Sequence, residues 1–192
     1  GRHRSEIEAH WPKVLRRVAG YNLDIFHPQS EKPYTRDGSV NLAHLLVGAE
    51  GTLAFTRSLT LQLDELPRGK VLGVVNFESF HKAMDSAQHI VALKPSAVEL
   101  VDRTMIELSL ANPAFRPTML TALKGSPAAI LLVEFSGHDK AVLLRQLQDL
   151  VALMGDRGLP GSVVEMPDEA PQKALWEVRK AGLNIMMSLK GD

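Results

Sequence analysis

The feature that most restricts the fold of this chain is a strand–helix–strand–helix pattern that occurs twice after residue 69. The first copy runs over 71–111 and the second over 128–181. Short stretches match between the copies: NFESFHKAM resembles EFSGHDKAV, and SAVELVDRTM resembles GSVVEMPDEA. Two units of this kind suggest an internal duplication. They predict an α+β fold, a ferredoxin-like layer in which a mixed or antiparallel four-stranded sheet has helices on one face.

The individual elements follow from apolar runs and from residues that begin or end helices. The strands are expected at 71–77, 97–101, 128–135 and 162–166, and the helices from Ser79, Asp102, Asp139 and Asp168. In the helix after Ser79 the expected apolar face consists of Phe80, Met84, Ala87 and Val91. The prolines at 113 and 117 indicate a connection between the two copies.

A glycine turn precedes this region, in the sequence VGAEGT at 47–52. Glycine lacks a Cβ, so Gly48 and Gly51 allow unusual dihedral angles or a close approach of the backbone to a ligand. From Leu53 to Leu63 apolar and polar residues alternate, which predicts a half-buried strand. A Pro–Arg–Gly sequence then interrupts the pattern, so we expect a domain boundary between residues 68 and 69.

The first fifty residues give weaker signals. Residues 5–19 favour a short helical region that Pro12 interrupts. Residues 27–38 have the composition of a loop. Ser39 or Asn41 can cap a brief helix that ends near Leu46.

Composition excludes several classes of protein. The chain has 22 basic and 22 acidic residues among 192, so bulk charge favours neither nucleic acid nor an anionic membrane as a partner. It has no cysteine, which excludes disulfides and an iron–sulfur cluster within the chain and fits a reducing compartment. The apolar run at 128–133 is too short to span a bilayer. We therefore expect a cytoplasmic protein.

Several motifs in the sequence resemble those of a known protein family. The stretch LLVGAEGTLAFTRSLTLQLDELP at 45–67 resembles the VGSEGTLG signature of FAD-linked oxidases of the vanillyl-alcohol-oxidase type. That family includes D-lactate dehydrogenase, the glycolate oxidase D subunit and D-2-hydroxyglutarate dehydrogenase. The likeness continues in RRVAGYNLDIF at 16–26, AVELVDRTMIEL at 97–108 and ALWEVRKAGLNIMMSLKGD at 174–192. It is greatest with large flavin dehydrogenases that have an added iron–sulfur domain.

The resemblance implies a division of labour along the chain. Residues 1–68 would be the C-terminal part of an incomplete FAD-binding domain, and 69–192 a substrate-binding cap domain truncated at its C-terminus. The chain would be an internal fragment, without the upstream phosphate loop and the downstream histidine segment of complete members. Residues that would contact FAD are Tyr21, Asn22, Gly48, Glu50, Gly51 and Thr52. Three positions depart from the family pattern, with Asn22 for Asp, Ala49 for Ser and Ala54 for Gly.

The implied activity is oxidation of a D-2-hydroxy acid, of the lactate, glycolate or 2-hydroxyglutarate type, by hydride transfer to the flavin. Trp176 and Arg179 are three residues apart, so they share one face of the last helix. The resemblance implies that Arg179 binds the substrate carboxylate. No catalytic residue is identified here, and the catalytic base is expected outside this chain. The fragment alone is expected to lack FAD and activity, while the electron acceptor and any oligomer stay open.

Two alternatives remain at this point. A duplicated ferredoxin-like layer can also be a non-catalytic module for small-ligand binding or oligomerisation. RNA binding is disfavoured, because only 5% of the residues are aromatic and the net charge is zero. His81, Asp85 and His89 have the spacing of metal ligands on one helix face, yet the polar face of an amphipathic helix accounts for them better. No metal site is predicted.

Overall fold

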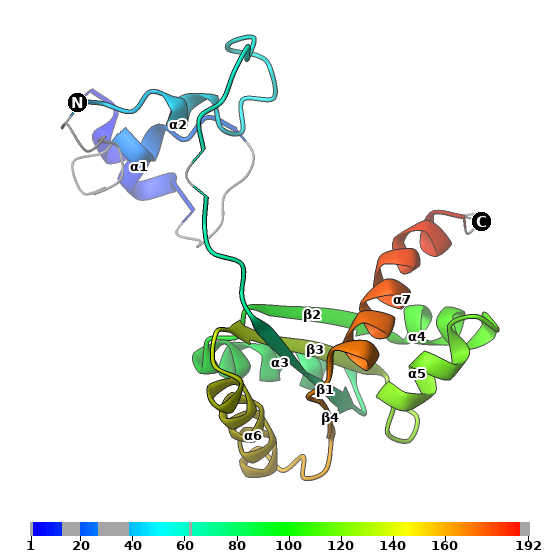
Figure 1. Cartoon of the computed structure of the whole chain (residues 1–192). Helices are drawn as coiled ribbons and strands as arrows, with labels where there is room; N and C mark the ends of the chain where they lie inside the picture. The colour runs from blue at the N-terminus through cyan, green and yellow to red at the C-terminus, as the bar shows by residue number, and fades with distance from the viewer. Residues whose placement is uncertain (1, 13–19, 27–38, 62, 189–192) are drawn as a thin grey trace. The chain divides into compact units, whose positions relative to one another are not determined.

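The computed structural model describes residues 2–12, 20–26, 39–61 and 63–188, the last six of these by their backbone alone. It divides the chain into two compact units, Gly1–Leu63 and Asp64–Asp192 (Figure 1). The division lies a few residues before the boundary expected at 68. The assignment of the two parts to a FAD-binding and a substrate-binding domain stays a prediction.

The second unit is built on one four-stranded sheet with the order β2-β3-β1-β4. The strands are β1 (Gly69–Phe77), β2 (Ala97–Asp102), β3 (Ala129–Gly137) and β4 (Val163–Met166). Every pair of neighbouring strands is antiparallel, with Gly69 opposite Gly137 in the central pair. This order is that of a ferredoxin-like layer, in which each outer strand is reached by a helical crossover. The predicted α+β fold class is therefore confirmed.

Helices connect and follow these strands. They are α3 (Phe80–Ile90), the short 3₁₀ helix η2 (Val91–Leu93), α4 (Arg103–Ala111), α5 (Arg116–Ala122), α6 (Lys140–Asp156) and α7 (Glu169–Ser188). Ser79, Asp102 and Asp139 cap α3, α4 and α6, each accepting a hydrogen bond from a backbone N–H of the first turn at 2.8 to 3.2 Å. The sequence analysis missed α5, because Pro117 lies in its first turn, where proline is tolerated.

The helices cover both faces of the sheet, which corrects the expectation of one covered face (Figure 1). Helices α3 and α6 bury residues such as Phe77 and Phe135 on one face. Helices α4, α5 and α7 bury Leu72, Leu132 and others on the opposite face. The physical reason lies in β1 and β3, where consecutive residues are apolar and therefore point to both faces.

Helix α3 presents a different face to the sheet than its large apolar residues suggested. Ala83, Ser86 and Ile90 are buried, whereas about half of Phe80 and Met84 is exposed. The small side chains pack beneath the helix, and the large ones of the expected apolar face lie toward solvent. The expectation for Phe80, Met84 and Val91 was wrong for this reason.

The first unit contains short elements. They are α1 (Arg4–His10), the 3₁₀ helix η1 (Leu23–Phe26) and α2 (Ala43–Leu46). The helix expected at 5–19 is present up to His10, and residues 13–19 lie outside the described residues. Leu42 occupies the N-cap position of α2, and the candidate cap one residue earlier, Asn41, accepts a hydrogen bond from the Ala43 N–H at 3.1 Å.

The strand expected from Leu53 to Leu63 is absent from the described residues of that segment, 53–61 and 63. Its apolar side chains are exposed: Phe55 by 94%, Leu59 by 73% and Leu63 by 89%. A strand needs a hydrogen-bonded neighbour, and the sheet of this chain consists of four other strands. Alternation alone therefore did not suffice to form a strand.

Candidate functional site

The glycine turn of the first unit has an unusual backbone. Gly48, Glu50 and Gly51 all have positive φ, at 86°, 49° and 78°. Positive φ costs glycine little, but it is uncommon for a residue such as glutamate. The turn is closed by the Thr52 N–H and hydroxyl, which both donate to the Ala49 carbonyl, at 2.9 and 2.6 Å. The sequence VGAEGT is thus folded into a tight, defined turn.

Two side chains from 22 to 31 residues earlier in the chain hold this turn by hydrogen bonds. The Tyr21 hydroxyl lies 2.9 Å from Thr52 Oγ1. The Asn22 side chain is buried, and its Nδ2 donates to the Val47 carbonyl at 2.9 Å and the His44 carbonyl at 3.4 Å. An ionised aspartate has no N–H to donate, so the amide of Asn22 suits this position. The structure therefore brings Tyr21 and Asn22 together with the turn.

A small open hollow of about 260 Å³ lies beside the turn. It is lined by Leu46, Ala49, Gly51, Ala54, Phe55 and Thr56. No heavy atom lies within 4 Å of the position that a Cβ on Gly51 would take. A flat ligand could therefore approach the backbone at Gly51. Glu50 is exposed beside it.

Arg179 lies on α7 of the second unit, and its Nε forms an ion pair with Glu99 Oε2 on β2. The side chain is 43% exposed. Trp176, one turn earlier, packs against the core cluster on the α4, α5 and α7 side of the sheet. Its Nε1 has no hydrogen-bond partner among the described residues.

Arg179 also borders an open groove of about 400 Å³. The residues that line it are Phe80, Leu100, Val101, Asp102, Met105, Arg179 and Gly182. Most of these are apolar, and among the described lining residues Arg179 is the cation and Asp102 the acid. A groove of this composition suits a small ligand with a carbon skeleton and a carboxylate.

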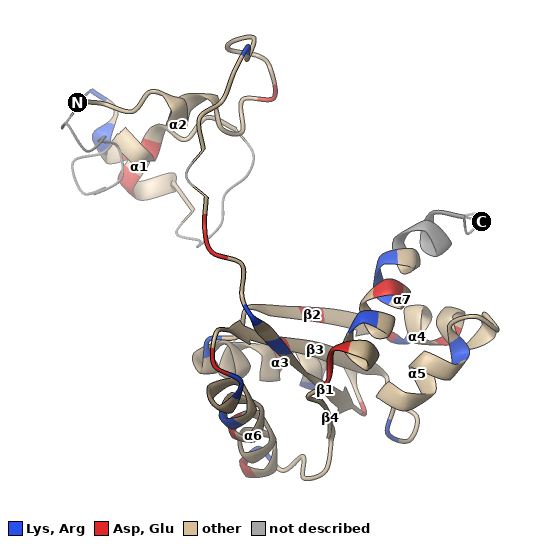
Figure 2. Cartoon of the chain, viewed as in Figure 1, with Lys and Arg blue, Asp and Glu red and all other residues tan. Residues whose placement is uncertain are grey.

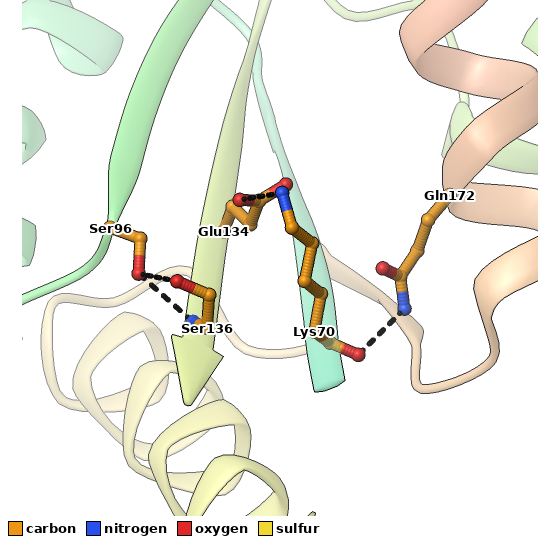
Figure 3. A network of polar contacts seen from close by, with 5 residues as sticks. All are labelled: Lys70, Ser96, Glu134, Ser136 and Gln172. Carbon is orange, nitrogen blue, oxygen red and sulfur yellow. Dashed lines mark hydrogen bonds and ion pairs between the residues drawn. The ribbon is translucent and has the colours of Figure 1, made fainter. Parts of the chain in front are cut away.

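The sequence analysis missed a polar network on the same face of the sheet (Figure 3). Lys70 Nζ lies 2.9 Å from Oε1 of Glu134, whose side chain is 10% exposed. Gln172 of α7 donates to the Lys70 carbonyl at 3.1 Å, and the Ser96 and Ser136 hydroxyls are 2.6 Å apart (Figure 3). The signal that could have revealed it is Glu134 itself, a lone acid in the otherwise apolar run 129–135.

The remaining charges of both signs are spread over the described second unit (Figure 2). Along α6, Lys140 and Arg145 precede Asp149 and Asp156, whereas the charges of α7 alternate in sign from Glu169 to Arg179. The Asp85 carboxylate accepts hydrogen bonds from Gln88 Nε2 at 3.1 Å and from Arg157 Nη2 at 2.5 Å.

Within the described parts of the chain, no three His, Cys, Asp or Glu side chains are grouped as metal ligands would be. Nor does any helix in those parts have the length and apolar character needed to cross a membrane.

Comparison with known proteins identifies the family to which this chain is related. Residues 66–192 match the model of the FAD linked oxidases, C-terminal domain. D-2-hydroxyglutarate dehydrogenase of Pantoea ananatis is 31% identical, over 98% of this chain and 19% of its own length. The enzyme of the same name from Escherichia coli is 26% identical over the same shares of both chains.

Another relative is the mitochondrial D-lactate dehydrogenase [cytochrome] of Arabidopsis thaliana, 27% identical over 74% of this chain and 24% of its own length. The chain thus spans about a fifth of the length of the curated relatives it matches. These relatives do not favour the alternative of a non-catalytic binding module. Because the family model covers more than half of the sequence, the chain belongs to the FAD linked oxidases and carries their C-terminal domain.

Proposed function

We propose that the complete protein is a FAD-dependent dehydrogenase that oxidises a D-2-hydroxy acid. The observation that carries this proposal is the family match over 66–192, together with relatives named D-2-hydroxyglutarate and D-lactate dehydrogenase. FAD, when bound, supplies the acceptor for the hydride that leaves the hydroxyl-bearing carbon. This chain's residues would hold and orient the two reactants.

The glycine turn fits a role at the edge of the flavin site. The backbone at Gly51 is open, because no side chain covers it. The hydrogen bond between Tyr21 and Thr52 holds this backbone in place, so a flavin would meet a rigid surface. Asn22 would keep this surface in place through its bonds to the Val47 and His44 carbonyls. Glu50, exposed at the same turn, completes the proposed set of residues near FAD.

Arg179 is our candidate for the group that binds the substrate carboxylate. A guanidinium is a planar fork that can donate two parallel hydrogen bonds to a carboxylate, which fixes orientation as well as charge. Arg179 is part-exposed, borders an apolar groove and is held at one nitrogen by Glu99. The groove is wide enough for the carbon chain of a small hydroxy acid.

Several properties of the complete protein go with this proposal. An iron–sulfur cluster, if the protein has one, would lie in a different part of it, because this chain has no cysteine. The catalytic base would also lie elsewhere, and the fragment alone would hold no stoichiometric FAD. Following the composition, we propose a cytoplasmic location.

The direct test is the absorbance spectrum of the complete flavoprotein. We expect the oxidised flavin bands to bleach when D-2-hydroxyglutarate or D-lactate is added under anaerobic conditions. The L-enantiomers are the matched control, since they carry the same groups but their single C2 hydrogen would point away from the flavin. Flavin bands that resist every D-2-hydroxy acid would contradict the proposal.

The test of Arg179 uses the variants Arg179→Ala and Arg179→Lys. We expect kcat/KM for the hydroxy acid to fall roughly tenfold or more, the scale of one charge-assisted hydrogen bond. Lysine should not restore activity, because an ammonium cannot form the bidentate pair. Lys180→Ala is the control, since Lys180 is the next residue on α7 and pairs with Glu177 in solvent. An unchanged kcat/KM in Arg179→Ala would remove Arg179 from the site.

A further inference from the structure

Glu99 is a carboxylate on the outer strand of the sheet, on the face that α7 covers. In the strand pairing it lies opposite the apolar Leu132 of β3. Its Oε2 atom is buried and accepts no hydrogen bond from any described residue. Among the described residues, Arg179 supplies the positive charge beside this atom, through an ion pair from its Nε. A buried carboxylate oxygen without a polar contact is costly, so the contact constrains both partners.

The contact uses the inner nitrogen of the guanidinium. Glu99 pairs with Nε, which carries one N–H, and the two terminal nitrogens of Arg179 carry the other four. A carboxylate bound through the terminal nitrogens would not have to displace Glu99. Occupation of Nε therefore leaves a complete bidentate donor pair available.

The same ion pair restricts where the guanidinium can lie. A free arginine side chain populates many rotamers, and ordering it on ligand binding costs free energy. Arg179 lines the groove together with Val101 and Met105, and its Nε is ion-paired with Glu99, which limits the rotamers open to it. Both strand residues that border this arrangement, Glu99 and Val101, come from β2 and point to the same face.

We propose that Glu99 is a positioning residue that orients the Arg179 guanidinium, so that its terminal nitrogens meet the carboxylate of a 2-hydroxy acid in the adjoining groove. This inference rests on the proposed role of Arg179. It assigns Glu99 no contact with the substrate. Its charge also partly neutralises the guanidinium, so the site favours ligands that make the two directed hydrogen bonds over anions that are attracted by charge alone.

The variants Glu99→Ala and Glu99→Gln both remove the ion pair with Arg179. Glutamine keeps the size of the side chain without its charge, whereas alanine removes both. In the complete flavoprotein, we expect Glu99→Ala to lower kcat/KM for D-2-hydroxyglutarate about tenfold, with a higher KM and a lower kcat per bound flavin. We expect Glu99→Gln to lose about as much, because the contact in the structure is an ion pair without a hydrogen bond, and an uncharged amide cannot form that pair.

A double-variant cycle tests whether Glu99 acts through Arg179. If it does, Glu99→Ala combined with Arg179→Ala should be no worse than Arg179→Ala alone, because the group to be positioned is already gone. Additive losses would overturn the proposal, since they indicate a role in the fold or a direct one. Thermal unfolding of each variant shows whether a loss of activity reflects unfolded protein.

The outcomes distinguish this inference from the function on which it rests. Unchanged activity in Arg179→Ala would overturn the anchor and, with it, the role of Glu99. Impaired Arg179→Ala with unchanged Glu99→Ala would overturn the role of Glu99 and leave the anchor standing. An unchanged kcat/KM in Glu99→Gln would show that the ion pair does not hold Arg179 in place, and would also overturn the proposal.

Discussion

The two units of the chain use apolar residues in opposite ways. In the second unit, the strands β1 and β3 are buried almost throughout, and two core clusters lie on the two faces of the sheet. In the described part of the first unit, Ala49 is the one apolar side chain that is buried. Leucines and a phenylalanine in the segment 53–63 face solvent instead.

The difference shows that an alternating apolar pattern forms a strand only where a neighbouring strand pairs with its backbone. β3 lies between β1 and β2, so its backbone groups are paired on both edges. The segment 53–63 alternates as a strand does, but it has no strand beside it among the described residues. What the first unit does have is local: a turn closed by Thr52 and fastened by Tyr21 and Asn22.

The largest expected effect concerns the two units taken separately. Residues 64–192 expressed alone should unfold in one cooperative transition, because both core clusters lie within them. Residues 1–63 alone should show no cooperative transition, since the described residues of that unit bury little apolar surface. Circular dichroism during heating and amide exchange would measure this. A sharp transition in the shorter piece would break the comparison.

The next effect compares two phenylalanines. Phe135 is 1% exposed in the core cluster with α3 and α6, and Phe55 is 94% exposed. Phe135→Ala should lower the free energy of unfolding by about 3–5 kcal/mol, through lost burial and a cavity. Phe55→Ala should change it by less than about 0.5 kcal/mol. Denaturant unfolding of both variants gives the numbers, and equal losses would show that the segment 53–63 is packed in solution.

A third comparison uses two buried asparagines. Asn76 Nδ2 donates to the Ala122 carbonyl at 3.2 Å, and its Oδ1 accepts from the Lys124 N–H at 3.0 Å. Asn76→Ala leaves these groups unpaired in the core and should cost about 1–3 kcal/mol in the main unfolding transition.

Asn22→Ala, the counterpart in the first unit, should leave the main transition unchanged and instead speed proteolysis near the glycine turn. The reason is that Asn22 fastens the carbonyls of His44 and Val47, which belong to that turn and not to the core. A fall in the main transition for Asn22→Ala would indicate that the two units unfold together.

The smallest expected effect concerns helix caps. Asp139 accepts from the Ala141 N–H at 2.8 Å at the start of α6, which has 17 residues. Asp139→Ala should therefore cost about 1 kcal/mol of unfolding free energy. Asn41→Ala, at the start of the four-residue α2, should have no measurable effect on the same transition. Thermal unfolding compares them, and an equal shift for both would contradict the separation of the units.

The sequence predicted much of the second unit and of the site's parts. All four strands lie where apolar runs placed them, and the caps Ser79, Asp102 and Asp139 mark real helix starts. Those signals are local, so no tertiary contact was needed to read them. The resemblance named Tyr21, Asn22 and Thr52 separately, and the structure joins them by hydrogen bonds. Their role toward FAD stays a prediction.

The misses have a common cause. The exposed Phe80, the second covered face of the sheet and the absent strand at 53–63 all depend on which element lies alongside. Phe80 was predicted to lie in the core because it is large and apolar, but the small Ala83 and Ser86 are the residues of α3 buried against the sheet. Lys70 and Glu134 are 64 residues apart, and no spacing rule connects them.

The sequence by itself determined the local elements, the fold class and the tight turn, because periodicity, capping and glycine conformations act within a few residues. Tertiary structure decided which faces are buried and which charges meet. The family resemblance of the last helix named Arg179, but its partner Glu99 lies on β2, 80 residues earlier in the chain. Only the packing of α7 across the sheet brings a guanidinium to that carboxylate, since ion pairing depends on distance in space and not along the chain.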